Sequence, residues 1–371
     1  MSAEFDVLRD DESAAPIGVA HKRARQTGIV LACLCAAIAA CAETRLRAPN
    51  EANALIAISE YIETGGARLY FETRGDNMDA PLLLWLHGGP GGAERPLFRY
   101  FNSDLERRFL VVYYDQRGAG RSFDPEATTT SLTIAQHVAD LDTLIEHLRS
   151  RYGRDHVLLV GHSWGAVLGS LYAKALPEKI SGLVAVAPVV SFSEQQQREY
   201  SYDLAEATRR GDEDALRDLR GIGPPPYQTP SAMIQLQRVT ERYHGVEFQS
   251  RSHAAIVVEG IFKGLVTPWE LFRIAQGNKR SLEAMHQELL AFDMRREVDM
   301  LQTPVFVFLG RHDRHVDANL AAEYFQRLRA PIKEIVWFEQ SAHDIPFDEP
   351  ELFDERIVEA ARRLALLPDA R

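Results

Sequence analysis

The sequence predicts an α/β fold: a mostly parallel central sheet with helices on both faces and an inserted helical segment. Three observations support this prediction. Short apolar runs recur and end at glycine or turn residues, amphipathic stretches separate them, and the pattern stops near residue 190 and resumes near residue 305. Such runs are typical of strands buried on both faces, and strands that alternate with helices favour a parallel sheet.

Six apolar runs predict the main strands, at residues 82–86, 109–114, 156–160, 180–187, 305–309 and 335–338. Ahead of them, residues 56–64 and 67–73 predict a hairpin that turns at Gly65-Gly66, because paired glycines accept the positive φ angles of a tight turn. Apolar residues at helical spacing predict helices over residues 132–149, 167–176 and 320–328.

The chain of 371 residues fits one large domain with an insertion. Residues 191–296 are polar, contain no comparable apolar run, and are broken at residues 221–226 by Gly-Ile-Gly-Pro-Pro-Pro. We therefore expect residues 53–190 and 297–371 to form the core. Residues 191–296 are expected to form a helical insertion between two strands of its sheet.

The composition is that of an ordinary globular protein, with 46% hydrophobic and 26% charged residues. A formal net charge of -11 without a basic stripe argues against a nucleic-acid partner. No cysteine follows Cys41. The folded body is therefore expected to have no disulfide, no thiolate metal site and no cysteine nucleophile.

The N-terminus has the order of a secretory signal peptide. A basic cluster at residues 21–25 precedes an uncharged, mostly apolar stretch at residues 27–40 that ends in small residues. This stretch is too short to span a bilayer comfortably, which takes about 20 residues. We therefore expect residues 1–40 to be removed, residues 41–52 to form a linker, and the protein to be exported to the cell envelope.

Ile38-Ala39-Ala40-Cys41 resembles the lipobox of bacterial lipoproteins. The resemblance implies that Cys41 is lipidated, becomes the first mature residue and anchors the protein to a membrane. Ordinary signal cleavage near Ala39 or Ala42, or an uncut anchor, is the alternative. The mostly acidic or neutral residues ahead of the basic cluster are unusual for a signal, so a downstream start such as Val19 stays open.

Gly161-His162-Ser163-Trp164-Gly165 lies between a predicted strand and a predicted helix. This is the G-x-S-x-G pattern of a nucleophile elbow, in which a sharp turn holds the serine in strained geometry and glycines avoid steric clashes. The pattern predicts Ser163 as the nucleophile. The alternative is a chance match in a glycine-rich loop.

The loop from His87 to Gly92 follows the predicted strand at 82–86. In folds with a nucleophile elbow, this loop supplies one backbone N–H of the oxyanion hole. We expect Gly89 to be that donor and the N–H of Trp164 to be the second, since Pro90 has no N–H. A tight loop without a catalytic role is the alternative, and His87 is expected to organise the loop rather than to act as a base.

A serine hydroxyl needs a base. His343 follows the last predicted strand and Asp313 follows the one before it. Because loops after parallel strands gather at one edge of the sheet, we expect both to lie near Ser163, with His343 as base and Asp313 orienting it. The order Ser, Asp, His is that of α/β-hydrolases. Asp317 is the reserve candidate for the acid.

His312-Asp313-Arg314-His315 also admits a zinc-site interpretation, because histidine and carboxylate side chains bind zinc. The flanking Arg311 and Arg314 argue against a cation there. We expect neither a metal nor any other cofactor.

These motifs together resemble the prolyl aminopeptidase-like branch of the α/β-hydrolases. The segments that carry the resemblance are His87–Gly92, Asp115–Ser122, Ser163 with its neighbours, Gly310–Asp313 and Ser341–His343. The resemblance implies an α/β-hydrolase fold, with a helical cap over the active site that the insertion at residues 191–296 can supply.

Prolyl aminopeptidases hold the free amino terminus of the substrate with carboxylates of the cap. The expected tryptophan-rich, glutamate-bearing cap motif is not evident here. Glu259 and Glu94 are the candidate substrate-binding carboxylates, and a surface position for either is the alternative.

The sequence thus predicts a serine hydrolase that cleaves a small amide or ester through an acyl-enzyme, with a small molecule or short peptide as substrate. A prolyl aminopeptidase-like activity is favoured, and a carboxylesterase with a lid is the alternative. A ligand-binding protein that has lost turnover is the alternative from another class. The sequence does not indicate an oligomeric state.

Overall fold

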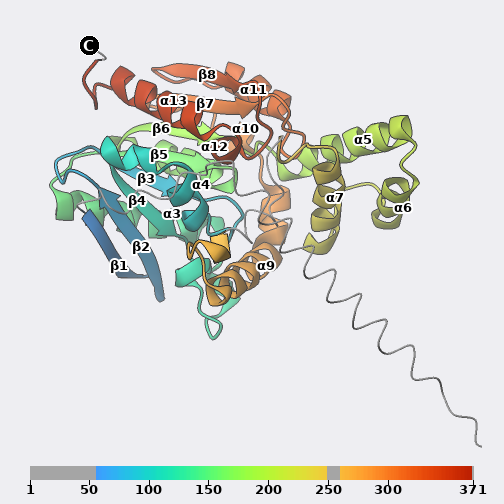
Figure 1. Ribbon diagram of the computed structural model, residues 1–371, viewed down its shortest axis with the longest axis horizontal. Coiled ribbons are helices and arrows are strands. Elements are labelled where there is room, and N and C mark those ends of the chain that lie inside the picture. Colours follow the sequence, from blue (N-terminus) through green and yellow to red (C-terminus); the bar gives the residue numbers. More distant parts are fainter. Residues whose placement is uncertain (1–55, 249–259, 370–371) are drawn as a thin grey trace, which may run out of the picture. The chain divides into compact units, whose positions relative to one another are not determined.

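The computed structural model describes residues 56–248 and 260–369. Its centre is a sheet of eight strands in the order β1-β2-β4-β3-β5-β6-β7-β8 (Figure 1). In that order the strands are Ile56–Thr64, Ala67–Gly75, Leu110–Asp115, Leu82–Leu86, Val157–His162, Ile180–Val186, Val305–Gly310 and Lys333–Phe338. β2 pairs antiparallel with β1 and β4, and all other neighbours are parallel. The predicted mostly parallel sheet is confirmed.

The apolar runs are continuous because the central strands are covered on both sides. Every residue of β3, β4, β5 and β7 is buried. β1, at the edge of the sheet, instead alternates between more and less exposed residues. Gly65 and Gly66 turn the hairpin with φ angles of 50° and 73°, which is the conformation that makes glycine suitable there.

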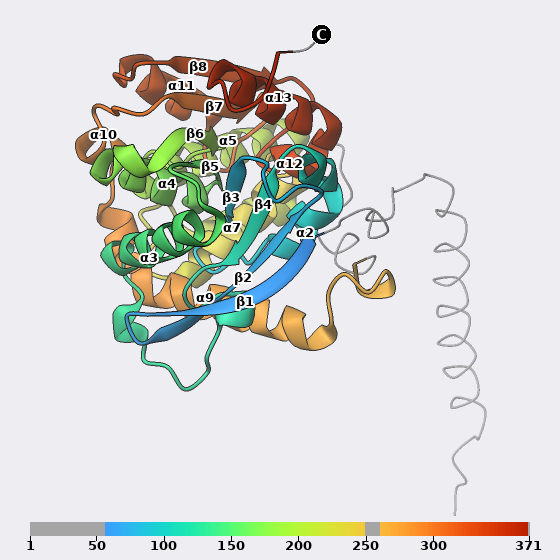
Figure 2. The same ribbon diagram turned by 90° about the vertical axis from the view of Figure 1, so that its left-hand side faces the viewer.

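Helices cover both faces of the sheet. Figure 2 shows α3 (Ile134–Tyr152) and α4 (Trp164–Ala175) on one face, and α2 (Arg95–Phe101), α12 (Ile345–Asp348) and α13 (Pro350–Arg363) on the other. The remaining core helix, α11 (Ala318–Arg327), packs against β7. These layers bring the loops that follow the parallel strands to one edge of the sheet, where the candidate site forms.

The chain between β6 and β7 is helical, as predicted. It contains α5 (Phe192–Arg210), α6 (Glu213–Ile222), α7 (Pro230–Arg242), α9 (Pro268–Ala291) and α10 (Met294–Glu297). The first three, on the right of the sheet in Figure 1, share a small core of their own around Leu219, Leu236 and Val239. α9 contributes Met285 and Leu289 to the main core instead. The exact division into core and insertion stays a prediction.

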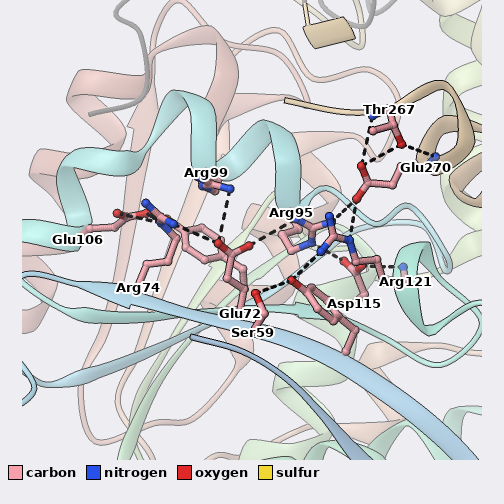
Figure 3. A network of polar contacts seen from close by, with 12 residues as sticks. Ser59, Glu72, Arg74, Arg95, Arg99, Glu106, Asp115, Arg121, Thr267 and Glu270 are labelled. Carbon is pink, nitrogen blue, oxygen red and sulfur yellow. Dashed lines mark hydrogen bonds and ion pairs between the residues drawn. The ribbon is translucent and has the colours of Figure 1, made fainter. Parts of the chain in front are cut away.

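A buried network of four arginines and four carboxylates holds the start of α9 (Figure 3). We call it the arginine–carboxylate network, and its members are Glu72, Arg74, Arg95, Arg99, Glu106, Asp115, Arg121 and Glu270. Arg95 lies at its centre and is 4% exposed. Its guanidinium is 3.0 Å from Glu270, 3.4 Å from Asp115 and 3.5 Å from Glu72.

Glu270 occupies the first turn of α9, where it forms a capping box with Thr267. It also accepts a 2.7 Å hydrogen bond from Arg121. The network therefore joins the inserted helix α9 to β2, to β4 and to α2, the helix that follows the predicted oxyanion loop.

Several predicted features lie outside the described residues. They are the signal peptide at residues 1–40, the lipidation site Cys41 and the candidate substrate-binding residue Glu259. Within residues 56–248 and 260–369, no helix combines the length and the apolar character that crossing a membrane requires.

Candidate active site

Ser163 occupies a strained turn between β5 and α4. Its φ and ψ angles are 54° and -115°, a conformation that costs a residue with a side chain about 1–3 kcal/mol. The two flanking glycines allow this turn. A Cβ at Gly161 would lie 2.4 Å from the carbonyl oxygen of Gly165, and one at Gly165 would lie 2.0 Å from that of Leu86. Side chains at either position would therefore clash with backbone.

The loops after β7 and β8 bring Asp313 against His343. Nδ1 of His343 lies 3.0 Å from Oδ2 of Asp313, and both side chains are buried. The other oxygen of Asp313 accepts the backbone N–H groups of His315 and Val316, each at 3.0 Å. The carboxylate is thus fixed from two sides.

The reserve candidate for the acid has a different position. Asp317 begins α11, where its Oδ1 accepts the backbone N–H of Leu320 at 2.8 Å. The structure therefore brings Asp313, and not Asp317, together with His343. Ser163 and His343 line the same cavity.

The environment of His343 favours its neutral form. Burial lowers the pKa of His343, and the neighbouring His162 and His315 lower it further, against the opposing effect of Asp313. Because the Asp313 carboxylate accepts a hydrogen bond at Nδ1, we assign the proton to Nδ1. Nε2 is then left as an acceptor for a hydroxyl proton.

The glycine-rich loop after β3 lies beside the serine. A Cβ at Gly88 would be 3.4 Å from Cβ of Ser163. Gly89 has a φ of 120°, which a residue with a side chain rarely adopts. Trp164 is the first residue of α4, so its N–H has no acceptor within the helix. The assignment of Gly89 and Trp164 as oxyanion donors stays a prediction.

His87 organises this loop. Its Nε2 accepts the backbone N–H of Gln116 at 3.0 Å, and its Nδ1 lies 2.8 Å from the carbonyl oxygen of Gly88 and 3.2 Å from the backbone nitrogen of Ala93. Burial lowers the pKa of His87. Gln116 also donates to the carbonyl of His87 at 2.8 Å and accepts from the indole of Trp164 at 2.9 Å. Gln116 thereby connects the loops that follow β3, β4 and β5.

The structure pairs Glu94 with His162, a contact that the sequence did not predict. Oε1 of Glu94 lies 2.9 Å from Nδ1 of His162, and Nε2 of His162 lies 3.1 Å from the carbonyl oxygen of His343. Burial opposes the charged form of His162, but Glu94 outweighs it and raises the pKa of His162 to about 9. His162 is therefore an imidazolium at neutral pH.

A surface position for Glu94 is ruled out. Its side chain is 15% exposed and lines the cavity. Its second oxygen, Oε2, is buried and has no hydrogen-bond partner among the described residues. A Cβ at Gly88 would be 2.6 Å from Oε1 of Glu94 and 3.4 Å from Ser163, so this carboxylate and the serine are close neighbours.

A second histidine–glutamate pair also lies beside His343. Nδ1 of His315 is 2.9 Å from Oε1 of Glu199, which belongs to α5 of the insertion. The ring centroids of His162 and His315 lie 4.9 Å and 5.0 Å from that of His343. The only signal in the sequence is the spacing of Gln195, Glu199 and Asp203, which places three polar residues on one helical face.

The cavity has a volume of about 380 Å³ and is enclosed by the core and the insertion together. Its walls are mainly apolar, with Phe192, Leu271, Ile274 and Phe347 among the lining residues. Three carboxylates also line it, Glu94, Glu199 and Asp344. No lysine or arginine lines it within the described part of the chain. The cationic side chains of His162 and His315 line it as well. Because the three carboxylates outnumber these two cations, the cavity suits an apolar group joined to a neutral or cationic one.

The zinc-site interpretation of residues 312–315 finds no support in the geometry. His312 stacks on Phe248 with ring centroids 3.8 Å apart, while His315 is paired with Glu199. In residues 56–248 and 260–369, no group of three or more histidine, cysteine or acidic side chains is arranged to hold a metal ion.

Known sequences resemble this chain over different lengths. A model for the alpha/beta hydrolase fold matches residues 81–234. The probable aminopeptidase YbaC of Bacillus subtilis (strain 168) is 28% identical over 322 residues, covering 83% of this chain and 97% of that protein. The proline iminopeptidase of Neisseria gonorrhoeae is 41% identical over 118 residues, covering 32% of this chain and 35% of that protein.

Solved structures support the same architecture. The proline iminopeptidase-related protein of Thermus thermophilus superposes with a TM-score of 0.60 at 24% sequence identity, covering 84% of this chain and 100% of that one. At this identity the likeness concerns the fold alone. Together with the match over residues 81–234, it confirms the predicted fold class.

Proposed function

We propose that the chain, which has the α/β-hydrolase fold, is a serine aminopeptidase that removes an apolar N-terminal residue from a short peptide or amide. The observation that carries this proposal is the position of Glu94. Its oxygen Oε2 has no partner among the described residues, and its carboxylate is a close neighbour of Ser163 in a cavity lined by apolar side chains.

The proposed bond-breaking steps use Ser163 as nucleophile and His343 as base. The Oγ of Ser163 attacks the substrate carbonyl while Nε2 of His343 takes the hydroxyl proton. The proton then passes to the leaving nitrogen, and the acyl group stays on Ser163 as an ester. Water, deprotonated by His343, attacks this ester and releases the acid.

The surrounding groups stabilise charge during these steps. Asp313 accepts from Nδ1 of His343 and stabilises the imidazolium that forms. In the proposed reaction the backbone N–H groups of Gly89 and Trp164 donate to the oxygen that becomes negative in each tetrahedral intermediate.

Glu94 explains a requirement for a free amino group. The α-nitrogen of an N-terminal residue lies roughly 2.5 Å from its carbonyl carbon, as bond lengths dictate. A substrate whose carbonyl is held at Ser163 therefore places its amine near Glu94. An ammonium group under the insertion is costly without a counter-charge, and a buried oxygen without a donor is costly too. Binding of the amine relieves both costs.

The test uses aminoacyl arylamides with free and acetylated amines. We expect cleavage of the free form only, and labelling of Ser163 by a fluorophosphonate. Ser163→Ala should abolish labelling and lower kcat by several orders of magnitude. Full activity of that variant would disprove the serine mechanism.

Glu94→Gln should raise KM for free arylamides and leave KM for acyl esters that lack an amine unaffected. The amide oxygen of glutamine still accepts from His162, so the variant removes charge rather than structure. Glu126→Gln, at an exposed position, serves as the matched control.

A carboxylesterase with a lid is the second candidate, favoured by the apolar walls of the cavity. Equal cleavage of free and acetylated arylamides, or activity on acyl esters alone, would establish this alternative and exclude the aminopeptidase.

A further inference from the structure

His315 contacts both members of the proposed acid–base pair. Its backbone N–H donates to Oδ1 of Asp313 at 3.0 Å. Its ring meets the ring of His343 edge to face, at 5.0 Å between centroids and an angle of 82°. A displacement of His315 would therefore change the positions of Asp313 and His343.

The insertion holds His315 through Glu199. This glutamate lies on α5, is 2% exposed, and faces Nδ1 of His315 at 2.9 Å. The same oxygen lies 2.9 Å from the hydroxyl of Thr240 on α7. The position of His315 is therefore tied to two helices of the insertion.

The protonation of Asp203 decides which carboxylate the Thr240 hydroxyl donates to. The Thr240 hydroxyl also lies 2.7 Å from Oδ2 of Asp203, yet a hydroxyl has one proton and donates to one partner. Burial, with the nearby Glu199, raises the pKa of Asp203 to about 8. The carboxyl of Asp203 thus keeps its own proton at neutral pH, which leaves the hydroxyl free to donate to Glu199.

His315 is a cation in this setting. Burial disfavours its charged form, but Glu199 on α5, Asp313 on its own loop and Asp344 after β8 raise the pKa of His315 to about 9. The ring of His343 lies near this charge and near that of His162, with centroid distances of 5.0 Å and 4.9 Å.

We propose that His315 is a positioning residue of the hydrolytic reaction, through which Glu199 of helix α5 holds Asp313 and His343 in alignment. The proposal rests on the serine mechanism proposed above. It gives the insertion a second role: besides enclosing the substrate, it sets the geometry of the acid and the base.

Arg198 provides a matched control. It is adjacent to Glu199 on α5 and also joins that helix to the core, through Asp317 and Glu323 at 3.4 Å each. Its loss removes an ionic contact between the same two parts of the molecule without removing a contact to Asp313 or His343.

The experiment measures kcat, KM and the rate of Ser163 labelling by a fluorophosphonate for His315→Ala, His315→Gln, Glu199→Gln and Arg198→Gln. His315→Ala should lower kcat and the labelling rate by about 10- to 100-fold, because small misplacements of reacting groups have effects of that size. KM should change much less than kcat, although His315 and Glu199 also line the cavity, since the proton-transfer step is the one that depends on their position. His315→Gln should recover much of the loss, because its amide can still donate to Glu199.

Two further results are expected. Glu199→Gln as a single variant should lower kcat. The double variant with His315→Ala should have the same kcat as His315→Ala, because the two residues act as one unit. Both His315 variants should move the acid limb of the pH profile of the labelling rate to higher pH. The reason is that loss of the positive charge beside His343 raises the pKa of His343. Arg198→Gln should change neither kcat nor the acid limb.

Three outcomes would overturn the inference: full kcat in His315→Ala, a rise in KM alone, or an unmoved acid limb in His315→Gln. The last of these remains decisive if His315→Ala does not fold. Ser163→Ala, measured in parallel, separates the two proposals. Activity in that variant disproves the serine mechanism, whereas an inactive Ser163→Ala beside a fully active His315→Ala disproves only the role of His315.

Discussion

Asp313 uses both of its carboxylate oxygens, one for His343 and one for two backbone N–H groups. We predict that Asp313→Asn keeps the fold but lowers kcat by about 10³- to 10⁴-fold, because the histidine tautomer is no longer fixed. Asp317→Asn should change kcat little, since Asp317 caps α11. Steady-state kinetics of both variants are the measurement, and the reverse ranking would move the acid to Asp317.

The lowered pKa of His343 predicts activity in mildly acidic solution. The base must be neutral, so labelling of Ser163 should be full above the pKa of His343 and fall as the pH drops through it. We expect this midpoint below 6.5, the usual value for histidine. The rate of fluorophosphonate labelling between pH 4 and about 8 tests the prediction, and a midpoint above 6.5 would contradict it.

Asp203 predicts a pH dependence of stability. Its pKa is raised to about 8 from an ordinary value of 3.8, so the folded state holds a proton that the unfolded state releases. Stability should therefore fall as the pH rises between these two values. Asp203→Asn, whose amide can donate to Thr240, should weaken this dependence and raise Tm at about pH 8. An unchanged slope of Tm against pH would refute the prediction.

The sequence predicted Ser163, Asp313 and His343 as the triad because each follows a strand, and the parallel order of strands brings such loops together. It could not identify the two histidine–glutamate pairs. Glu94 and His162 are 68 residues apart, and His315 and Glu199 are 116 apart. Their pairing depends on how α5 and the loop after β3 pack, which no local pattern encodes.

At the scale of elements, the sequence predicted most strand ends to within one or two residues, because burial on both faces leaves continuous apolar runs. The helix after the elbow was predicted from residue 167 but begins at Trp164. Gly165 obscured its first turn, since glycine is a poor helix former. The arginine–carboxylate network had no sequence signal, because its members come from six separate elements.

That network predicts a large effect of one substitution. Arg95→Met should destabilise the protein by about 3–5 kcal/mol, because it leaves buried carboxylates without their counter-charge. Arg356→Met, which breaks an ion pair with Glu359 at 43% and 52% exposure, should change stability little. Denaturant unfolding of both variants is the measurement, and equal effects would show that the network does not anchor α9.

For the whole molecule, the lipobox-like segment predicts a membrane location. If Cys41 is acylated, the protein should carry more than one acyl chain, which suffices for stable anchoring, whereas one chain is marginal. Cys41→Ala should then move it from the membrane fraction to a soluble or unprocessed form. Mass spectrometry of the mature N-terminus gives the decisive result, and an unlipidated start at Glu43 would show ordinary cleavage.

If Cys41 carries a lipid anchor, the position of β1 determines how the folded body bears that tether. Residues ahead of Ile56 join the body at the edge of the sheet, and β2 and β4 separate that edge from β3, the nearest strand with a loop beside Ser163. A pull on this end is therefore taken up by the nine-residue pairing of β1 with β2. The strands that carry the acid and the base, β7 and β8, form the opposite edge. Mechanical load at the attachment point is thus kept away from the groups whose alignment matters most.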